Sequence, residues 1–198
     1  MTIDDQSVAF WDSQAADFDG EPDHGLRDPS VREAWRRLLT GVVASEPLRI
    51  ADLGCGTGSL SLLLAAEGHE VTGLDFSAAM IDVARGKAID ADPPLTFVVG
   101  DAADPKLPGG SYDVVLVRHV LWAMSDPDAA LERWFRLLAD GGRLVLIEGS
   151  WWTGAGMEAD ATLELVRRRH ANPFITMLTD PELWGGPITD ERYMVVCA

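Results

Sequence analysis

The middle of the chain alternates short apolar runs with segments of helical periodicity, and this alternation constrains the fold more than any other feature. The runs Val114–Val117 and Leu144–Ile147 read VVLV and LVLI, with no polar residue among the apolar ones. Consecutive apolar residues are typical of parallel strands that are covered on both faces. Five such strands are predicted, at Leu48–Leu53, Glu70–Asp75, Leu95–Gly100, Tyr112–Arg118 and Arg143–Glu148.

The segments between these strands carry helix start and stop signals. One helix begins near Gly58 and ends at Gly68, and Ser77 is placed as the N-cap of the next. A third helix opens at Asp126, which precedes a proline, and is expected to end at Asp140. Strands and helices in alternation predict an α/β protein with a doubly wound parallel sheet and right-handed crossovers.

The two flanks differ from this centre. Two helical segments precede it, at Asp4–Phe18 and Pro29–Ala44. After it, a helix near Met157–His170 leads to a β-hairpin, whose strands we place at Phe174–Leu178 and Arg192–Cys197. A hairpin at the end of a parallel sheet requires one antiparallel strand, which is allowed at an edge.

Charge excludes several classes of partner. The chain has 16 Lys and Arg against 32 Asp and Glu, a formal net charge of −16 over 198 residues. Phosphate backbones and anionic lipids both bind clustered cations, so we expect neither nucleic acid nor a membrane as a partner. Cys55 and Cys197 lack metal-ligand spacing, so we expect no disulfide framework and no metal. The first residues lack the apolar core of a signal peptide, and no apolar run approaches a membrane span, which predicts a cytoplasmic protein.

A glycine-rich loop follows the first strand and opens a helix. It reads DLGCGTG from Asp52 to Gly58, and Asp75 ends the next strand 17 residues later. Glycines let a ligand approach the backbone, and a carboxylate at that strand end can accept ribose hydroxyls, so the pair indicates an adenosine-type ligand. The GxGxG spacing departs from the dinucleotide pattern GxGxxG. In addition, Asp52 would place a negative charge near the pyrophosphate of a dinucleotide. A ligand without phosphate that carries positive charge, such as S-adenosylmethionine, suits this loop better.

Five motifs in order then resemble one family over nearly the whole chain. They are DLGCGTG at 52–58, GLDFS at 73–77, Gly100-Asp101-Ala102, YDVVLVRHVLW at 112–122 and DGGRLVLIEG at 140–149. The chain resembles class I S-adenosylmethionine-dependent methyltransferases, of the small-molecule type related to quinone biosynthesis. The resemblance implies a Rossmann-like sheet of seven strands in the order 3-2-1-4-5-7-6, with the seventh antiparallel. It also implies a single domain over 1–198, with N-terminal lid helices at 1–45, a cofactor-binding core at 46–150 and a C-terminal helix and hairpin at 151–198.

The same resemblance assigns roles to matching positions. Asp52 and the glycine loop should hold the methionine portion, Asp75 the ribose and Asp101 the adenine amino group. The full set of cofactor-binding residues that it implies is Trp11, Phe18, Asp52, Gly54, Cys55, Gly56, Thr57, Gly58, Asp75, Phe76, Met80, Asp101, Ala102 and Arg118.

Residues around the sheet edge are candidates for the acceptor side. His24 and His119 are each a candidate general base, where the nucleophile must lose a proton. The tryptophans Trp122, Trp151 and Trp152 are expected to wall an apolar acceptor pocket, although tryptophan is often simply core. The other two histidines, His69 and His170, are expected at the surface.

These features predict methyl transfer from S-adenosylmethionine to an O, N or C nucleophile of a small organic acceptor. Three alternatives stay open at this point. The first is a methyltransferase that acts on a protein or RNA, and the second is a non-catalytic binder of S-adenosylmethionine or S-adenosylhomocysteine. The third is a nicotinamide-dependent oxidoreductase, which the glycine spacing disfavours. Sequence leaves both monomer and homodimer open.

Overall fold

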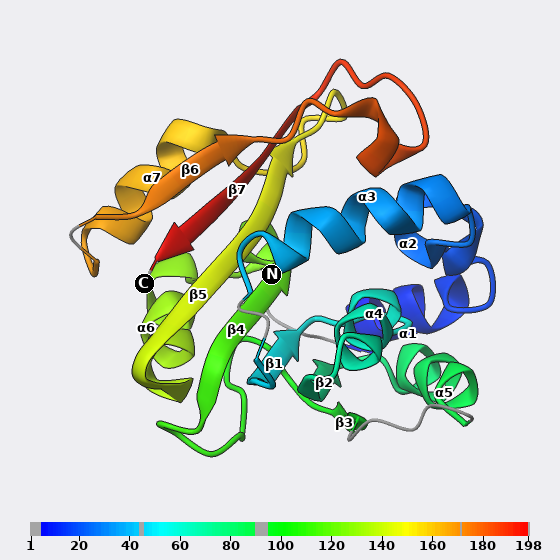
Figure 1. The fold of residues 1–198 in the computed structure, drawn as a ribbon, viewed down its shortest axis with the longest axis horizontal. Coiled ribbons are helices and arrows are strands. Elements are labelled where there is room, and N and C mark those ends of the chain that lie inside the picture. The colour runs from blue at the N-terminus through cyan, green and yellow to red at the C-terminus, as the bar shows by residue number, and fades with distance from the viewer. Residues whose placement is uncertain (1–4, 44–45, 90–94, 171, 198) are drawn as a thin grey trace.

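A computed structural model describes residues 5–43, 46–89, 95–170 and 172–197 of the chain (Figure 1). Its sheet has seven strands in the order β3-β2-β1-β4-β5-β7-β6, as predicted. The strands are β1 (Arg49–Leu53), β2 (Glu70–Asp75), β3 (Leu95–Val99), β4 (Tyr112–Arg118), β5 (Leu138–Ser150), β6 (Phe174–Met177) and β7 (Glu191–Cys197). β7 is antiparallel to both neighbours, and the other pairings are parallel, which confirms the predicted fold class.

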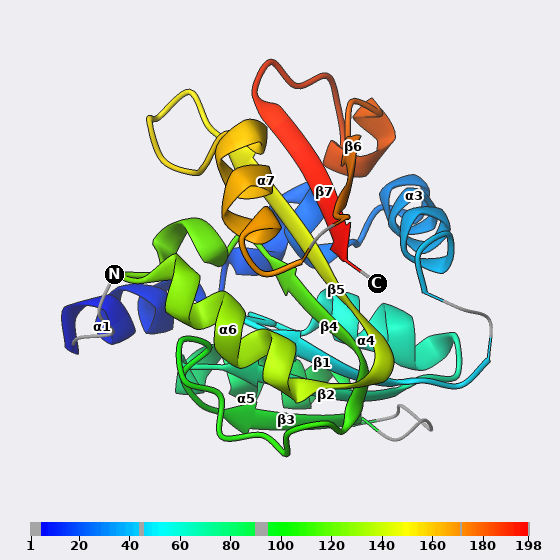
Figure 2. The same ribbon diagram turned by 90° about the vertical axis from the view of Figure 1, so that its left-hand side faces the viewer.

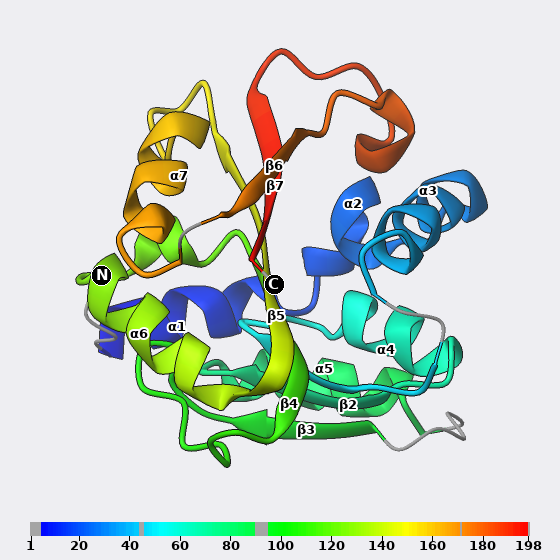
Figure 3. The same cartoon turned by 60° about the vertical axis from the view of Figure 1, so that its left-hand side comes forward.

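Helices cover both faces of this sheet. They are α1 (Asp5–Gln14), α2 (Pro22–Gly25), α3 (Pro29–Thr40), α4 (Ser59–Ala66), α5 (Ala78–Lys87), α6 (Pro127–Leu137) and α7 (Ala159–Arg167), with short 3-10 turns η1 (Phe18–Gly20), η2 (Leu121–Ala123) and η3 (Pro181–Trp184). α6 and α7 lie on one side of the strands and α3 and α4 on the other (Figures 2 and 3).

Alternate residues of the central strands supply two separate cores. In β4, Val114 and Leu116 pack with α3 and α4, whereas Val115 and Val117 pack with α6 and α7. All four are buried. Successive side chains of a strand point to opposite faces, so an uninterrupted apolar run is what a sheet covered on both sides requires.

Helix boundaries follow the predicted caps with one exception. The Ser77 hydroxyl accepts from the Met80 amide at 3.1 Å, and Asp126 caps α6. However, α6 ends at Leu137 rather than at Asp140, and β5 begins at once and runs to Ser150. The pairing register of β4 and β5 shifts between Tyr112 and Val114. This irregularity allows β5 to include Gly141 and Gly142, which were expected to form a turn before the strand.

The N-terminal segment is more broken than predicted. α1 ends at Gln14, so the expected helix to Phe18 is wrong beyond that residue, and the predicted start at Asp4 lies outside the described residues. α3 runs from Pro29 to Thr40, and Ala44 is likewise outside the described part. Proline at the start of α2 begins a new helix rather than continuing an old one.

The surface prediction for His69 is wrong. Its side chain is buried, and its Nδ1 accepts from the Leu48 amide at 3.2 Å, where it links the start of β1 to the chain entering β2. His170 is partly buried, with its ring stacked on Phe135 at a centroid distance of 6.0 Å. Within the described ranges, no helix combines the length and apolar character that a membrane span needs.

Candidate active site

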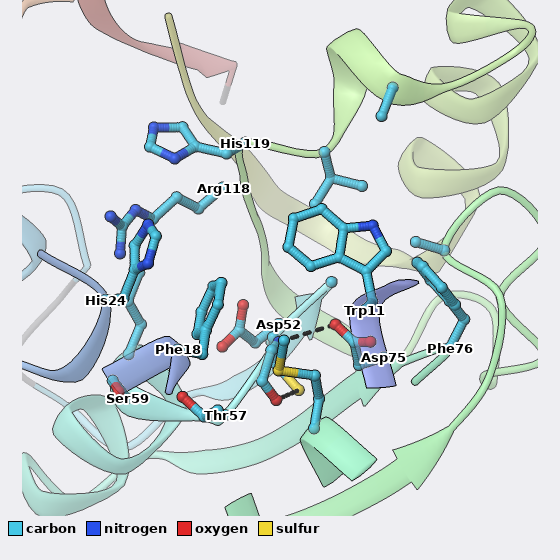
Figure 4. Close-up of a pocket in the computed structure, with 18 of the residues that line it drawn as sticks. Trp11, Phe18, His24, Asp52, Thr57, Ser59, Asp75, Phe76, Arg118 and His119 are labelled. Atoms are coloured by element: carbon cyan, nitrogen blue, oxygen red, sulfur yellow. Dashed lines mark hydrogen bonds between the residues drawn. The ribbon is translucent and has the colours of Figure 1, made fainter. Parts of the chain in front are cut away.

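A cavity of about 510 Å³ opens at the carboxyl ends of β1, β2 and β4. This is the edge at which open α/β sheets bind ligands. Seventeen of the residues predicted for the site line it: Trp11, Phe18, His24, Asp52, Gly54, Cys55, Gly56, Thr57, Asp75, Phe76, Met80, Asp101, Ala102, Arg118, His119, Trp122 and Trp151. Figure 4 shows Asp75 and Phe76 toward one end and Arg118 and His119 toward the other, with Asp52 and Phe18 between them.

Two of the predicted residues lie outside the cavity lining. Trp152 is 85% exposed, so the structure places it apart from the predicted acceptor wall. Gly58 is the N-cap residue before α4, with φ +76°, and a Cβ there would lie 2.5 Å from the Phe97 ring. The absence of a side chain at Gly58 therefore allows close packing between α4 and the sheet.

The glycine loop is held against the second strand. The amides of Gly54 and Cys55 both donate to the Leu74 carbonyl, at 2.7 and 3.0 Å. Gly54 has φ +71°, and a Cβ there would meet the Val120 side chain at 2.3 Å. The loop thus brings bare backbone to the cavity, as the GxGxG pattern predicts.

Asp75 lies at the end of β2 with a carboxylate fixed by two backbone amides. Gly56 donates to Oδ2 and Ser77 donates to Oδ1, each at 2.9 Å. Burial raises the pKa of this carboxyl above its usual value, although both hydrogen bonds oppose the rise. Each carboxylate oxygen retains capacity to accept a further hydrogen bond from a ligand.

Asp52 lines the same cavity and is more deeply buried than Asp75. Its side chain is buried, and Oδ2 accepts from the Ser61 hydroxyl at 2.5 Å. Burial raises the pKa of Asp52 to about 6, with Ser61 and Arg118 acting in the other direction. A buried carboxylate of this kind is stabilised by a cationic ligand group.

The N-terminal segment, residues 5–25, closes one side of the cavity. The Phe18 ring lies over Gly56, where an added Cβ would be 3.3 Å from Cε1, and stacks on His24 at 4.2 Å. Asp19 accepts from the Thr57 hydroxyl at 2.5 Å and from Lys87 at 2.8 Å. Aromatic packing and these polar contacts join the segment to the loop that it covers.

Arg118 and His119 shape the opposite end. Arg118 donates to the side chain and the carbonyl of Asp23, at 2.5 and 2.7 Å, and its guanidinium lies 4.4 Å from the Trp35 ring centroid. His119 has φ +57°, a left-handed conformation that is uncommon for a residue with a side chain. Burial and the nearby Arg118 hold the pKa of His119 well below its usual value, so its imidazole is neutral at physiological pH.

Glu148 is a functional candidate that the sequence prediction missed. It is fully buried at the end of β5, and its Oε1 accepts from the amides of Val120 and Leu121 at 3.0 and 2.7 Å. Burial raises the pKa of Glu148 to about 8. It thus fixes the loop that follows His119. In the sequence, the position of Glu148 directly after the apolar run in LVLIEG could have indicated a buried acidic residue at the end of that strand.

The prediction also missed several cavity residues from outside the recognised motifs. Arg192 comes from β7, and Glu21 and Asp23 come from the N-terminal segment. Nothing near these residues in the sequence marks them, because only the fold brings them to the cavity. No group of three or more His, Cys, Asp or Glu that could hold a metal ion occurs among the residues with described positions.

Comparison with known proteins agrees with this geometry. Residues 51–146 match the family model described as a methyltransferase domain. A demethylmenaquinone methyltransferase of Thermus thermophilus is 38% identical over 117 residues, which cover 58% of this chain and 53% of that protein. The chain spans about half the length of that curated relative.

Solved structures share the fold at low identity. Geranyl diphosphate C-methyltransferase from Streptomyces coelicolor, solved with S-adenosylhomocysteine, has a TM-score of 0.71 at 17% identity and covers 83% of this chain and 78% of its own. The [4+2]-cyclase SpnF has a TM-score of 0.70 at 20% identity, covering 83% and 79%. One of these structures is named a methyltransferase and the other a cyclase, so the fold alone does not identify the reaction. The reaction has to be inferred from the residues of the site.

Proposed function

Residues 51–146 form a methyltransferase domain, and from this premise we propose that the protein transfers a methyl group from S-adenosylmethionine to a small organic acceptor. The observation that carries the proposal is the pair of carboxylates on one cavity. Asp75 presents unused acceptor capacity at the end of β2, and the buried Asp52 lies beside the glycine loop. These two sites match ribose hydroxyls and an ammonium group, and neither suits a pyrophosphate.

The cavity fits the proposed cofactor in size and chemistry. Its volume of about 510 Å³ lies within the range of sites for small ligands. Phe76 and Met80 line the end where adenine would pack, next to Asp101. When bound, S-adenosylmethionine supplies a methyl group that is already activated by a sulfonium.

The residues of the chain then have three tasks: binding, orientation and exclusion of water. Phe18 lies over the glycine loop, and the Trp11 ring packs edge-on against Phe18 in the same cavity. Holding well-oriented reactants together in such a site is worth roughly 7–11 kcal/mol. His24 and His119 line the acceptor end, and burial lowers the pKa of both imidazoles. Each therefore offers a neutral ring nitrogen at the acceptor end, and the lowered pKa that keeps it neutral also makes it a weaker base than a free imidazole.

Binding is tested first, by calorimetric titration with S-adenosylhomocysteine and with NAD as the negative ligand. We expect micromolar-range binding of the first ligand alone. Asp75→Asn should weaken it by about tenfold or more, because a charge-assisted hydrogen bond contributes about 1.5–3 kcal/mol. The exposed Asp140→Asn is the matched control and should leave the affinity unchanged.

Activity is tested second, with S-adenosylmethionine carrying a labelled methyl group and a panel of small phenols, amines and carboxylates. Label transferred to a panel member supports the proposal. Binding without transfer to any small molecule, protein or RNA would indicate a non-catalytic binder instead. A folded protein that binds NAD and not S-adenosylhomocysteine would overturn the proposal.

A further inference from the structure

Buried hydrogen-bonding atoms without partners gather at the acceptor end of the cavity. Six buried side-chain nitrogen or oxygen atoms lack a hydrogen bond within the described part of the chain. Four of them belong to cavity residues: His24 Nδ1, Arg118 Nε, His119 Nε2 and Arg192 Nε. Buried polar groups are almost always paired in native proteins, so a cluster of exceptions calls for an explanation.

The two arginine atoms in this cluster restrict what the missing partner can be. A guanidinium N–H only donates, so Arg118 Nε and Arg192 Nε each require an acceptor. Both side chains are little exposed, at 11% and 12%. In such a site an anionic oxygen forms a stronger hydrogen bond than a neutral one.

Arg192 is the better placed of the two to meet an acceptor molecule. Its guanidinium lies 5.1 Å from the ring centroids of both Trp151 and Trp184. Its recorded ion pair is with Asp190, through Nη2 at 3.1 Å. By contrast, Arg118 uses both terminal nitrogens on Asp23. Arg192 is therefore held by aromatic packing while keeping donor capacity.

Charged groups of both signs face this end of the cavity. Burial is the main reason that the pKa of His119 lies well below its usual value, and the nearby guanidinium groups of Arg118 and Arg192 lower it further. Asp23 and Asp190 balance the two arginines, and Glu21 lines the same cavity. An anionic ligand would bind at the arginine Nε atoms, which these carboxylates leave without a partner.

We propose that the methyl acceptor carries a carboxylate that binds Arg192 beside His119, with its apolar body packed against Trp122 and Trp151. This inference rests on the proposed function, since it names the class of acceptor for the same site. Trp122 and Trp151 contact each other with ring centroids 5.6 Å apart and both line the cavity. Flat aromatic walls beside a guanidinium suit a planar aromatic or unsaturated acid.

The test uses the full chain saturated with S-adenosylhomocysteine. Benzoate, 2-naphthoate and indole-3-carboxylate are titrated calorimetrically, each against its neutral carboxamide. We expect at least one carboxylate to bind about tenfold more tightly than its carboxamide, and Arg192→Met to reduce that preference below about twofold. Arg49→Met is the matched control, because Arg49 forms a similar pair with Asp113 at the start of β1, away from the cavity edge.

Three outcomes would overturn the acceptor proposal: carboxamides that bind as tightly as carboxylates, no carboxylate binding to the saturated protein, or a preference that survives Arg192→Met. Failure of the wild-type protein to bind S-adenosylhomocysteine would instead overturn the proposed function. Arg192→Gln, which keeps a hydrogen-bond donor without charge, serves if the methionine variant fails to fold. It should also lose the preference while its affinity for S-adenosylhomocysteine stays within about twofold.

Discussion

Replacing Glu148 by glutamine should stabilise the protein, relative to the wild type, progressively more as the pH rises from 5 to 7. Glu148 is fully buried, and its Oε1 accepts from two backbone amides while Oε2 has no partner among the described residues. Burial raises the pKa of this carboxyl from its usual 4.5 to about 8. Glutamine keeps an oxygen for the two amides and carries no charge at any pH.

The sign follows from the protons held by each state. Between pH 4.5 and about 8, unfolded Glu148 is ionised while folded Glu148 keeps its proton, so the unfolded state binds fewer protons. The contribution of this group to stability is therefore complete below pH 4.5 and declines as pH rises to about 8. The slope is about 1.4 kcal/mol per pH unit, so about 3 kcal/mol is lost between pH 5 and pH 7.

The assay is urea unfolding of the wild type and Glu148→Gln at pH 5, 6 and 7. The free energy of unfolding of the variant minus that of the wild type should grow by about 3 kcal/mol across this range, because every other titrating group is shared. The exposed Glu164→Gln is the control and should show a difference that stays constant. A constant difference for Glu148→Gln as well would refute the reasoning, since Glu148 would then be ionised in the folded protein.

Three further predictions concern the loop, the cofactor and the acceptor wall. Gly58→Ala should cost about 2–4 kcal/mol in urea unfolding, because its Cβ would lie 2.5 Å from an aromatic ring, whereas Gly110→Ala, with open space and φ +65°, should cost about 1 kcal/mol. Affinity for S-adenosylhomocysteine should fall about tenfold per pH unit below pH 6, where Asp52 takes up a proton, and stay level above it; Asp52→Asn should remove this dependence in calorimetry. Trp122→Ala should weaken indole-3-carboxylate binding by about tenfold, while Trp152→Ala, which removes an exposed ring, should change it less than twofold; equal effects would contradict the assigned wall.

Sequence reasoning succeeded where local chemistry is decisive. The apolar runs of β4 and β5, the caps at Ser77 and Asp126, and the glycine loop each depend on residues close together in the chain. These signals predicted the strands and helices of the core. The resemblance to a family supplied the strand order, which the structure confirms.

Sequence reasoning failed where distant segments meet. Arg192 reaches the cavity only because β7 pairs with β5, and His69 is buried only because it follows α4 under the chain entering β1. Trp152 follows Trp151 directly, yet one ring lines the cavity and the other faces solvent. No local sequence pattern distinguishes these two tryptophans, because the course of the loop after β5 decides which ring points to the cavity and which to solvent.

The contacts of the N-terminal segment bear on how fast the cavity exchanges its contents. Asp12 accepts from the Ser77 hydroxyl at 2.5 Å, Asp19 binds both Thr57 and Lys87, and Phe18 lies across the glycine loop. We expect a molecule held beneath Phe18 to leave more easily when this segment moves aside and these contacts break. We therefore expect side chains that lie away from the reacting atoms to set the residence time of the cofactor product.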